Sequence, residues 1–98
     1  MKVSVDLCVI PIGVGLSLSK YIAECEKVLV KFDLNCQLHA FGTNIEGEWD
    51  TVFEAIKRCH EHLHALGVVR LHTSIKCGTR TDKSQKLDDK INSVKKLL

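Results

Sequence analysis

Residues 35–48 read NCQLHAFGTNIEGE, two short alternating segments that meet near a glycine. From Asn35 to Phe41 the side chains alternate between two faces, and Gly42 ends the alternation, as in a strand that stops at a turn. Residues 43–48 can return as a second strand, which predicts a hairpin around Gly42 and Asn44. Helical patterns flank this hairpin on both sides, so its position decides which fold the chain can adopt.

The two flanking segments have the periodicity of amphipathic helices. After a connection over residues 11–19, apolar side chains recur at helical spacing from Leu18 to Phe32, and we expect the hydroxyl of Ser17 or Ser19 to cap the helix that starts there. A second helix is predicted from about Trp49 to Leu66, with acidic residues in its first turn and Gly67 at its end. The apolar positions of the first helix are Leu18, Tyr21, Ile22, Cys25, Val28, Leu29 and Phe32.

Two further strands and a short helix complete the pattern. Residues 3–10 and 69–77 alternate between apolar and polar side chains, and a polar link over residues 78–86 leads to a short helix over residues 87–98. The resulting order is strand, helix, strand, strand, helix, strand, helix. It predicts an α+β domain over residues 1–98: a four-stranded, mainly antiparallel sheet with two helices on one side, the ferredoxin-like βαββαβ plan, and an extra C-terminal helix as an appendage.

This fold leaves the second face of the sheet without a helix. Two interpretations of that face stay open: a solvated surface, or a hydrogen-bonded interface with another protomer. The residues expected there are Ser4, Asp6, Cys8, Gln37, His39, Phe41, Arg70, His72, Ser74 and Lys76.

Composition excludes several classes of protein. The chain has 98 residues, 45% of them hydrophobic, which gives one small domain whose modest core makes self-association a natural expectation. A formal net charge of +2 is too close to neutral for non-specific nucleic-acid binding. Five cysteines without a C-x-x-C pair fit neither a disulfide framework nor a zinc finger, and indicate reduced thiols in the cytoplasm. The apolar run over residues 7–18 is too short and too interrupted to span a membrane.

Three motifs suggest chemistry, and each has a simpler interpretation. Gly13 and Gly15 precede a helix, but neither a dinucleotide fingerprint nor a P-loop follows, so we favour a tight turn. The cluster His60, His62 and His64 beside Cys59 lacks an evident third metal ligand, and we favour surface histidines. The remaining motif is a candidate nucleophile, Cys8, which faces Asp6 and is expected near His39. We expect the other cysteines, Cys25, Cys36, Cys59 and Cys77, in the core, and we do not favour covalent catalysis.

A family resemblance connects several segments that span nearly the whole chain. They are residues 9–13 (VIPIG) with the following serines and Tyr21, 42–48 (GTNIEGE), 69–73 (VRLHT), 79–83 (TRTDK) and 90–94 (KINSV). Together they resemble the small thiamine-binding-protein family related to YkoF. The resemblance implies a ferredoxin-like domain that pairs its sheets into dimers and tetramers. It also implies binding of thiamine (vitamin B1) or its hydroxymethylpyrimidine portion, without catalysis or a cofactor.

The chemistry of such a ligand points to particular side chains. An aminopyrimidine presents an amine donor beside a ring-nitrogen acceptor, so a carboxyl group can pair with both, and Glu46 is our first choice for this role. The thiazolium ring carries a fixed positive charge that suits an aromatic face or an anion. The other residues expected at the site are Thr43 and Gly42 on the hairpin, His39, Arg70 and Ser74 on the adjoining sheet, and Asp82 or Arg80 in the polar link.

The sequence therefore predicts a cytoplasmic, non-enzymatic homo-oligomer, a dimer or tetramer, that binds thiamine or a pyrimidine precursor and neither nucleic acid nor membrane. The alternative is a structural or regulatory homo-oligomer with another ligand or a protein partner. A small enzyme that uses Asp6, Cys8 and His39 is a third hypothesis. The sequence does not decide whether the ligand site lies within one subunit or between two.

Overall fold

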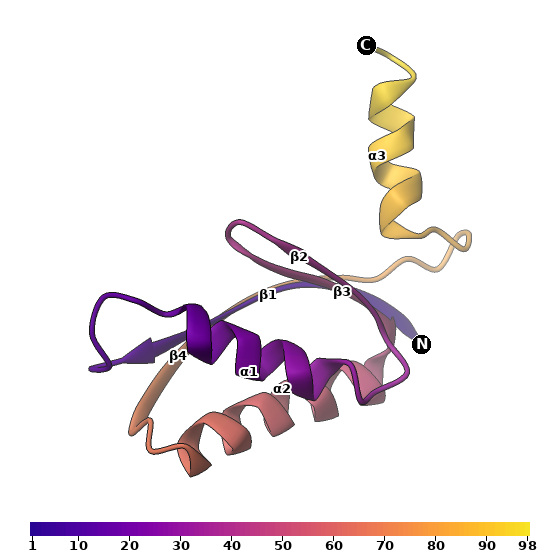
Figure 1. Cartoon of the computed structure of the whole chain (residues 1–98). Coiled ribbons are helices and arrows are strands. Elements are labelled where there is room, and N and C mark those ends of the chain that lie inside the picture. Colours follow the sequence, from indigo (N-terminus) through magenta and orange to yellow (C-terminus); the bar gives the residue numbers. More distant parts are fainter.

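The sheet is arranged around its amino-terminal strand. The computed structural model describes residues 1–98 and orders the four antiparallel strands β2-β3-β1-β4, with β1 between β3 and β4 (Figure 1). Two helices, α1 and α2, lie on one face of the sheet, and the opposite face carries none (Figure 1). The fold is thus an α+β ferredoxin-like fold, as predicted. Its elements are β1 (Lys2–Ile12), α1 (Ser19–Leu29), β2 (Asn35–His39), β3 (Gly42–Glu48), α2 (Trp49–Ala65), β4 (Arg70–Gly78) and α3 (Leu87–Lys95).

The strand register fixes which side chains meet the helices. Val5 of β1 lies opposite Ile45 of β3 and Cys77 of β4, and the odd-numbered side chains of β1 point toward the helices. The core forms between this face and the apolar stripes of α1 and α2. Its buried residues are Val3, Val5, Leu7, Cys25, Val28, Leu29, Ile45, Val52, Ala55, Ile56, Cys59, Leu63 and Val68.

The expected apolar face of β4 is only partly covered. Leu71 packs against the core, but Ile75 and Cys77 are exposed. The prediction of a buried Cys77 was therefore wrong: β4 is an edge strand, and its final residues are not enclosed by the helices. Cys36, on the other edge strand, is partly buried.

Helix and hairpin ends differ from the prediction in several places. Helices α1 and α3 end at Leu29 and Lys95, each three residues earlier than predicted. Leu18 occupies the position before α1 with no side-chain hydrogen bond, so neither Ser17 nor Ser19 caps the helix. The β2–β3 turn lies at Ala40 and Phe41, and Gly42 is already the first residue of β3. The predicted end of α2 is confirmed within one residue, because Gly67 follows with a φ of 98° that glycine adopts without strain.

The third helix is an appendage, as predicted. Residues 79–86 carry the chain away from the end of β4, and α3 projects from the body without burying a single residue (Figure 1). The radius of gyration is therefore 14.6 Å, compared with about 13 Å for a compact domain of this length. None of the three helices combines the length and apolar character needed to cross a membrane.

Candidate functional site

A groove of about 1070 Å³ lies where β1 begins and β4 ends. One part of its lining comes from Met1 and the first three residues of β1, from residues 33–35 at the start of β2 and from residues 46–47 of β3. The other part comes from residues 78–86 except Asp82, which lead to α3, together with Lys90 of α3 itself. Segments far apart in the sequence thus enclose one space, whose volume is large enough for a small organic ligand.

Glu46 joins the sheet to the third helix inside this groove. Its side chain projects from the helix-free face of β3, opposite Ser4 of β1 and Asn35 of β2. One carboxylate oxygen, Oε1, accepts a hydrogen bond from Nδ2 of Asn35, and Oε2 accepts the backbone N–H of Leu87 at 3.0 Å. A carboxylate is favourable at this place because the amino end of a helix carries partial positive charge.

The polar link folds onto itself through Arg80. Its Nη2 donates to Oδ2 of Asp82 at 2.9 Å, its Nε donates to Oδ1 of the same residue, and its Nη1 donates to Oε1 of Gln85 at 2.8 Å. The hydrogen bonds from Arg80 lower the pKa of Asp82, and those to Asp82 raise the pKa of Arg80. Arg80 lines the groove, whereas Asp82 does not. Asp82 therefore acts on the groove by holding Arg80.

A second polar pair lies farther along the helix-free face. Nε2 of His39 lies 2.8 Å from Oδ1 of Asp6, and the backbone N–H of Phe41 donates to Nδ1 of His39 at 3.2 Å. Since an amide can only donate, Nδ1 is the acceptor and Nε2 carries the proton that is donated to Asp6. Gly42 lies against this pair, where a Cβ would be 3.0 Å from Oδ1 of Asp6. Cys8 forms no hydrogen bond with either member of the pair, so this contact does not activate the candidate nucleophile.

The remaining predicted residues are dispersed rather than gathered. Thr43 faces the helices with 5% of its surface exposed, and its hydroxyl donates to Glu26, so it lies on the opposite face from Glu46. Ser74 lies opposite Cys8, and Arg70 lies opposite Ile12 at the far end of β1. The strand from Ser4 to Ile12 spans about 26 Å at roughly 3.3 Å per residue. One small ligand in the groove therefore cannot contact both Glu46 and Arg70 of the same chain.

Several groove residues have no signal in the sequence. Asn35 binds Glu46 across two strands, and the amide of Leu87 reaches it from 41 residues away. A backbone amide is present at every residue except proline, so no motif could have marked this one. In the sequence, Lys83, Lys86 and Lys90 resemble ordinary solvent-exposed lysines. Only the folded chain places them along the groove.

The three histidines of α2 have three separate partners. His62 lies 2.8 Å from Glu24 of α1, His60 lies 2.6 Å from the hydroxyl of Thr73, and Nδ1 of His64 donates to the carbonyl of Val68 at 2.7 Å. Burial, together with nearby His64, lowers the pKa of His60. The side chains thus tie α2 to its neighbours and do not converge on a common point.

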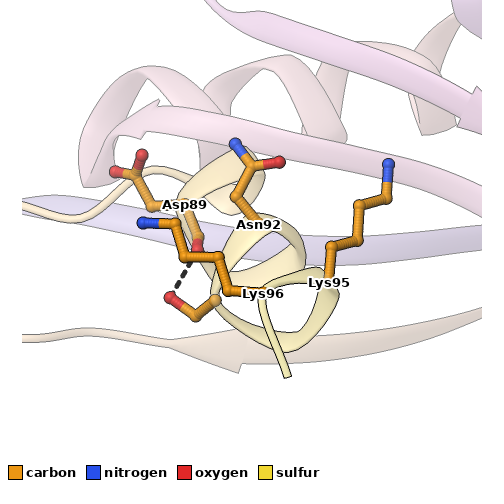
Figure 2. Close-up of a pocket in the computed structure, with 5 residues that line it drawn as sticks. Asp89, Asn92, Lys95 and Lys96 are labelled. Carbon is orange, nitrogen blue, oxygen red and sulfur yellow. Dashed lines mark hydrogen bonds between the residues drawn. The ribbon is translucent and has the colours of Figure 1, made fainter. Parts of the chain in front are cut away.

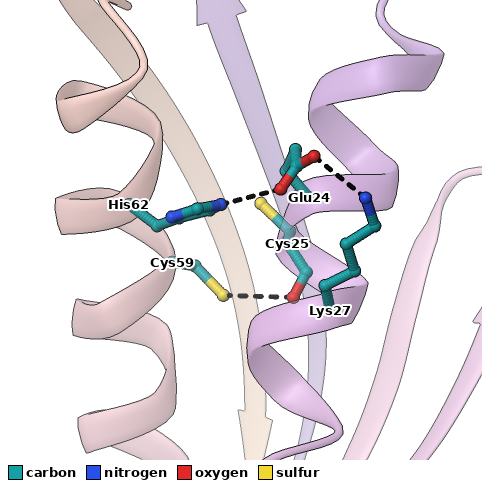
Figure 3. A network of polar contacts seen from close by, with 5 residues as sticks. All are labelled: Glu24, Cys25, Lys27, Cys59 and His62. Atoms are coloured by element: carbon teal, nitrogen blue, oxygen red, sulfur yellow. Dashed lines mark hydrogen bonds and ion pairs between the residues drawn. The ribbon is translucent and has the colours of Figure 1, made fainter.

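Figure 3 shows the contacts between α1 and α2. The hydrogen bond from His62, together with that from Lys27, lowers the pKa of Glu24. Below this network, Sγ of Cys59 donates to the carbonyl oxygen of Cys25 at 3.7 Å. The contact with Cys25, reinforced by burial, raises the pKa of Cys59 far above its ordinary value, so this thiol is a core group.

A smaller hollow on α3 is lined by residues of that helix alone. Asp89, Asn92, Lys95 and Lys96 surround it, and the hydroxyl of Ser93 donates to the carbonyl of Asp89 at 2.8 Å (Figure 2). One helix cannot enclose a ligand, so the groove beside Glu46 is the candidate site.

One known protein family matches nearly the whole chain. Residues 5–95 match the model of a family described as thiamine-binding protein. The chain belongs to this family. A UPF0045 protein of Synechocystis sp. is 55% identical over 94 residues, which cover 96% of this chain and 78% of the relative. A UPF0045 protein of Eremothecium gossypii is 45% identical over 95 residues, covering 96% of this chain and 90% of the relative.

Solved structures share the same fold. The crystal structure of a hypothetical protein from Methanocaldococcus jannaschii superposes with a TM-score of 0.88 at 33% identity, and covers 96% of both chains. A Thermotoga maritima protein with a proposed role in thiamine biosynthesis or salvage has a TM-score of 0.82 at 16% identity. That match covers 96% of this chain and 99% of the other. At this low identity the second likeness supports the fold alone.

Proposed function

We propose that the protein binds thiamine, or its hydroxymethylpyrimidine portion, without converting it chemically. The observation that carries this proposal is a carboxylate, Glu46, in a groove of adequate size on a chain of the thiamine-binding protein family. The exocyclic amine of an aminopyrimidine is a donor that a carboxylate oxygen accepts, and Asn35 holds the Glu46 side chain in position for it. The ligand would take the place of the Leu87 amide or share Oε2 with it.

We also propose that the protein forms a homo-oligomer, a dimer or a tetramer. The apolar side chains of α3 project into solvent, with Ile91 44% and Val94 59% exposed, and the helix-free face of the sheet is uncovered. A second copy would bury these surfaces. A site shared between two copies is also the arrangement in which Arg70 could contact the ligand, because Arg70 of the same chain lies at the far end of β1 from Glu46. We place this assembly in the cytoplasm because all five cysteines are free thiols, which suit a reducing compartment.

Thermal unfolding with and without thiamine or hydroxymethylpyrimidine tests the binding proposal. A ligand at 100 times its dissociation constant adds about 2.7 kcal/mol of stability, and each kcal/mol raises Tm by about 4–8 °C at this size. Glu46→Gln should remove the shift, while Glu61→Gln, on the exposed face of α2, should retain it. Absence of a shift in the wild type with either compound at millimolar concentration would refute the thiamine assignment. An assembly indifferent to both compounds would favour a structural or regulatory homo-oligomer.

A further inference from the structure

The groove beside Glu46 concentrates positive charge. Five basic side chains line it, those of Lys2, Arg80, Lys83, Lys86 and Lys90, against two acidic ones, Asp33 and Glu46. The local excess of three positive charges exceeds the formal charge of +2 of the whole chain. A concave surface lined by one sign of charge attracts ligands of the opposite sign.

Three of these lysines have no ion-pair partner. Arg80 is occupied by Asp82 and Gln85, and Lys2 lies 3.4 Å from Glu48. Lys83, Lys86 and Lys90 form no salt bridge. Lys86 immediately precedes α3 and Lys90 lies in its first turn, and both line the groove. The carboxylate of Asp89 accepts the backbone N–H of Lys86 at 2.9 Å and is not part of the groove lining. Three ammonium groups are thus free to bind an anion.

Hydroxyl groups accompany the lysines. Thr79, Thr81 and Ser84 line the same groove, and none of these hydroxyls has a hydrogen-bond partner in the protein. Ammonium and hydroxyl donors around an open space form the kind of environment that phosphate oxygens prefer, because charge-assisted hydrogen bonds to a phosphate are strong and numerous. The lining therefore offers more donors than a neutral pyrimidine can use.

Charge also discriminates between forms of the ligand. The thiazolium ring of free thiamine carries a fixed positive charge, which an excess of lysines repels. A phosphate monoester carries about −1.5 to −2 charges at pH 7, so it reverses the sign of this interaction. We infer that the ligand of this groove is a phosphate ester, with its aminopyrimidine at Glu46 and its phosphate held by Lys83, Lys86 and Lys90. This inference rests on the proposed function for the pyrimidine half and on the groove itself for the phosphate half.

Isothermal titration calorimetry of the full chain tests the pyrimidine part and the phosphate part of this inference separately. The compounds are thiamine, its mono- and diphosphate, hydroxymethylpyrimidine, its phosphate, and inorganic pyrophosphate. We expect the phosphate esters to bind at least about tenfold more tightly than the corresponding alcohols, as two or three charge-assisted contacts allow, and this advantage to shrink with added salt. Comparison of the thiamine and hydroxymethylpyrimidine series shows which ester fits.

Lysine variants identify the groups responsible. The double substitution Lys86→Gln and Lys90→Gln should abolish the preference for phosphate and leave the affinity for the alcohols unchanged or higher. Lys86→Arg with Lys90→Arg should retain the preference. Lys57→Gln, at an exposed lysine of α2 outside the groove, should behave as wild type. The measured Tm of each variant verifies that it is folded.

The outcomes separate failure of this inference from failure of the proposed function. Equal affinity for esters and alcohols, with binding lost in Glu46→Gln, would refute the phosphate site and leave the pyrimidine site standing. Lysine-dependent binding of pyrophosphate without any binding of thiamine or hydroxymethylpyrimidine would refute the proposed function and support the phosphate site. No binding of any compound would refute both.

Discussion

Gly42 is the position where an added methyl group should damage the sheet most directly. It begins β3 alongside β1, and a Cβ built on it would lie 2.5 Å from the carbonyl oxygen of Leu7. Carbon and oxygen atoms in contact across strands are normally about 3.3–3.6 Å apart. Gly42→Ala therefore requires the first residues of β3 to move away from β1 by close to 1 Å, and the same methyl group presses on Asp6, which binds His39.

The expected loss follows from the cost of overpacking. Forcing an extra methyl group into a packed region costs about 1–3 kcal/mol, and a domain of this size loses about 4–8 °C in Tm per kcal/mol. Thermal unfolding followed by circular dichroism should therefore show a Tm lower by about 5–20 °C. Gly78→Ala is the matched control, because it also lies at a strand end but has nothing within 4 Å of its Cβ position, so its Tm should be close to that of wild type. Equal Tm values for the two variants would show that the close approach to Leu7 is not a constraint.

Two further predictions concern the helices. Hydrogen bonds from His62 and then Lys27 lower the pKa of Glu24 below its ordinary value of 4.5, so the stability that this carboxylate provides is present above that value and is lost as the pH falls through the lowered pKa. Denaturant unfolding should thus find Glu24→Gln less stable than wild type at pH 7, with a difference that shrinks as the pH falls below 4.5, while Glu61→Gln serves as control. A difference that stays constant with pH would contradict this explanation. Ile91→Asp with Val94→Asp should leave the folded body intact but yield a smaller species in sedimentation velocity, because the apolar side of α3 is exposed within one chain. Asn92→Asp, on another side of α3, should sediment as wild type, and unchanged sedimentation of the double variant would exclude α3 from the proposed assembly.

Periodicity predicted the elements well because it reflects burial, which operates residue by residue. The core of β1, the stripes of α1 and α2 and the stop at Gly67 all follow from this local rule. Turn and cap positions were less accurate, since several polar residues near Ser17 and Asn44 satisfy the same local preferences. The exposure of Cys77 depends on which strand lies at the sheet edge and on how far the helices extend over the sheet. The alternation of apolar and polar residues predicts neither.

The candidate site was predicted only in part. Glu46 was expected to lie near the polar link, and the structure brings it to the groove that Arg80 also lines. Thr43 is three residues from Glu46, and in a strand an odd separation places two side chains on opposite faces, so strand geometry alone separates them. The contacts of Glu46 with Asn35 and Leu87 depend on tertiary folding and could not be derived from spacing.

The inner position of β1 also has a consequence for the time course of folding. β1 is synthesised first, yet its pairing with β4 joins Ser4 to Gly78, near the opposite end of the chain. Until residues 70–78 exist, one whole edge of β1 has unpaired amides and carbonyls, and such an edge is a template for other chains. A polypeptide interrupted before Arg70 should therefore aggregate, and closing this long loop should be the slow step of refolding. The solubility of the nascent protein thus depends on how soon β4 is synthesised and pairs with β1.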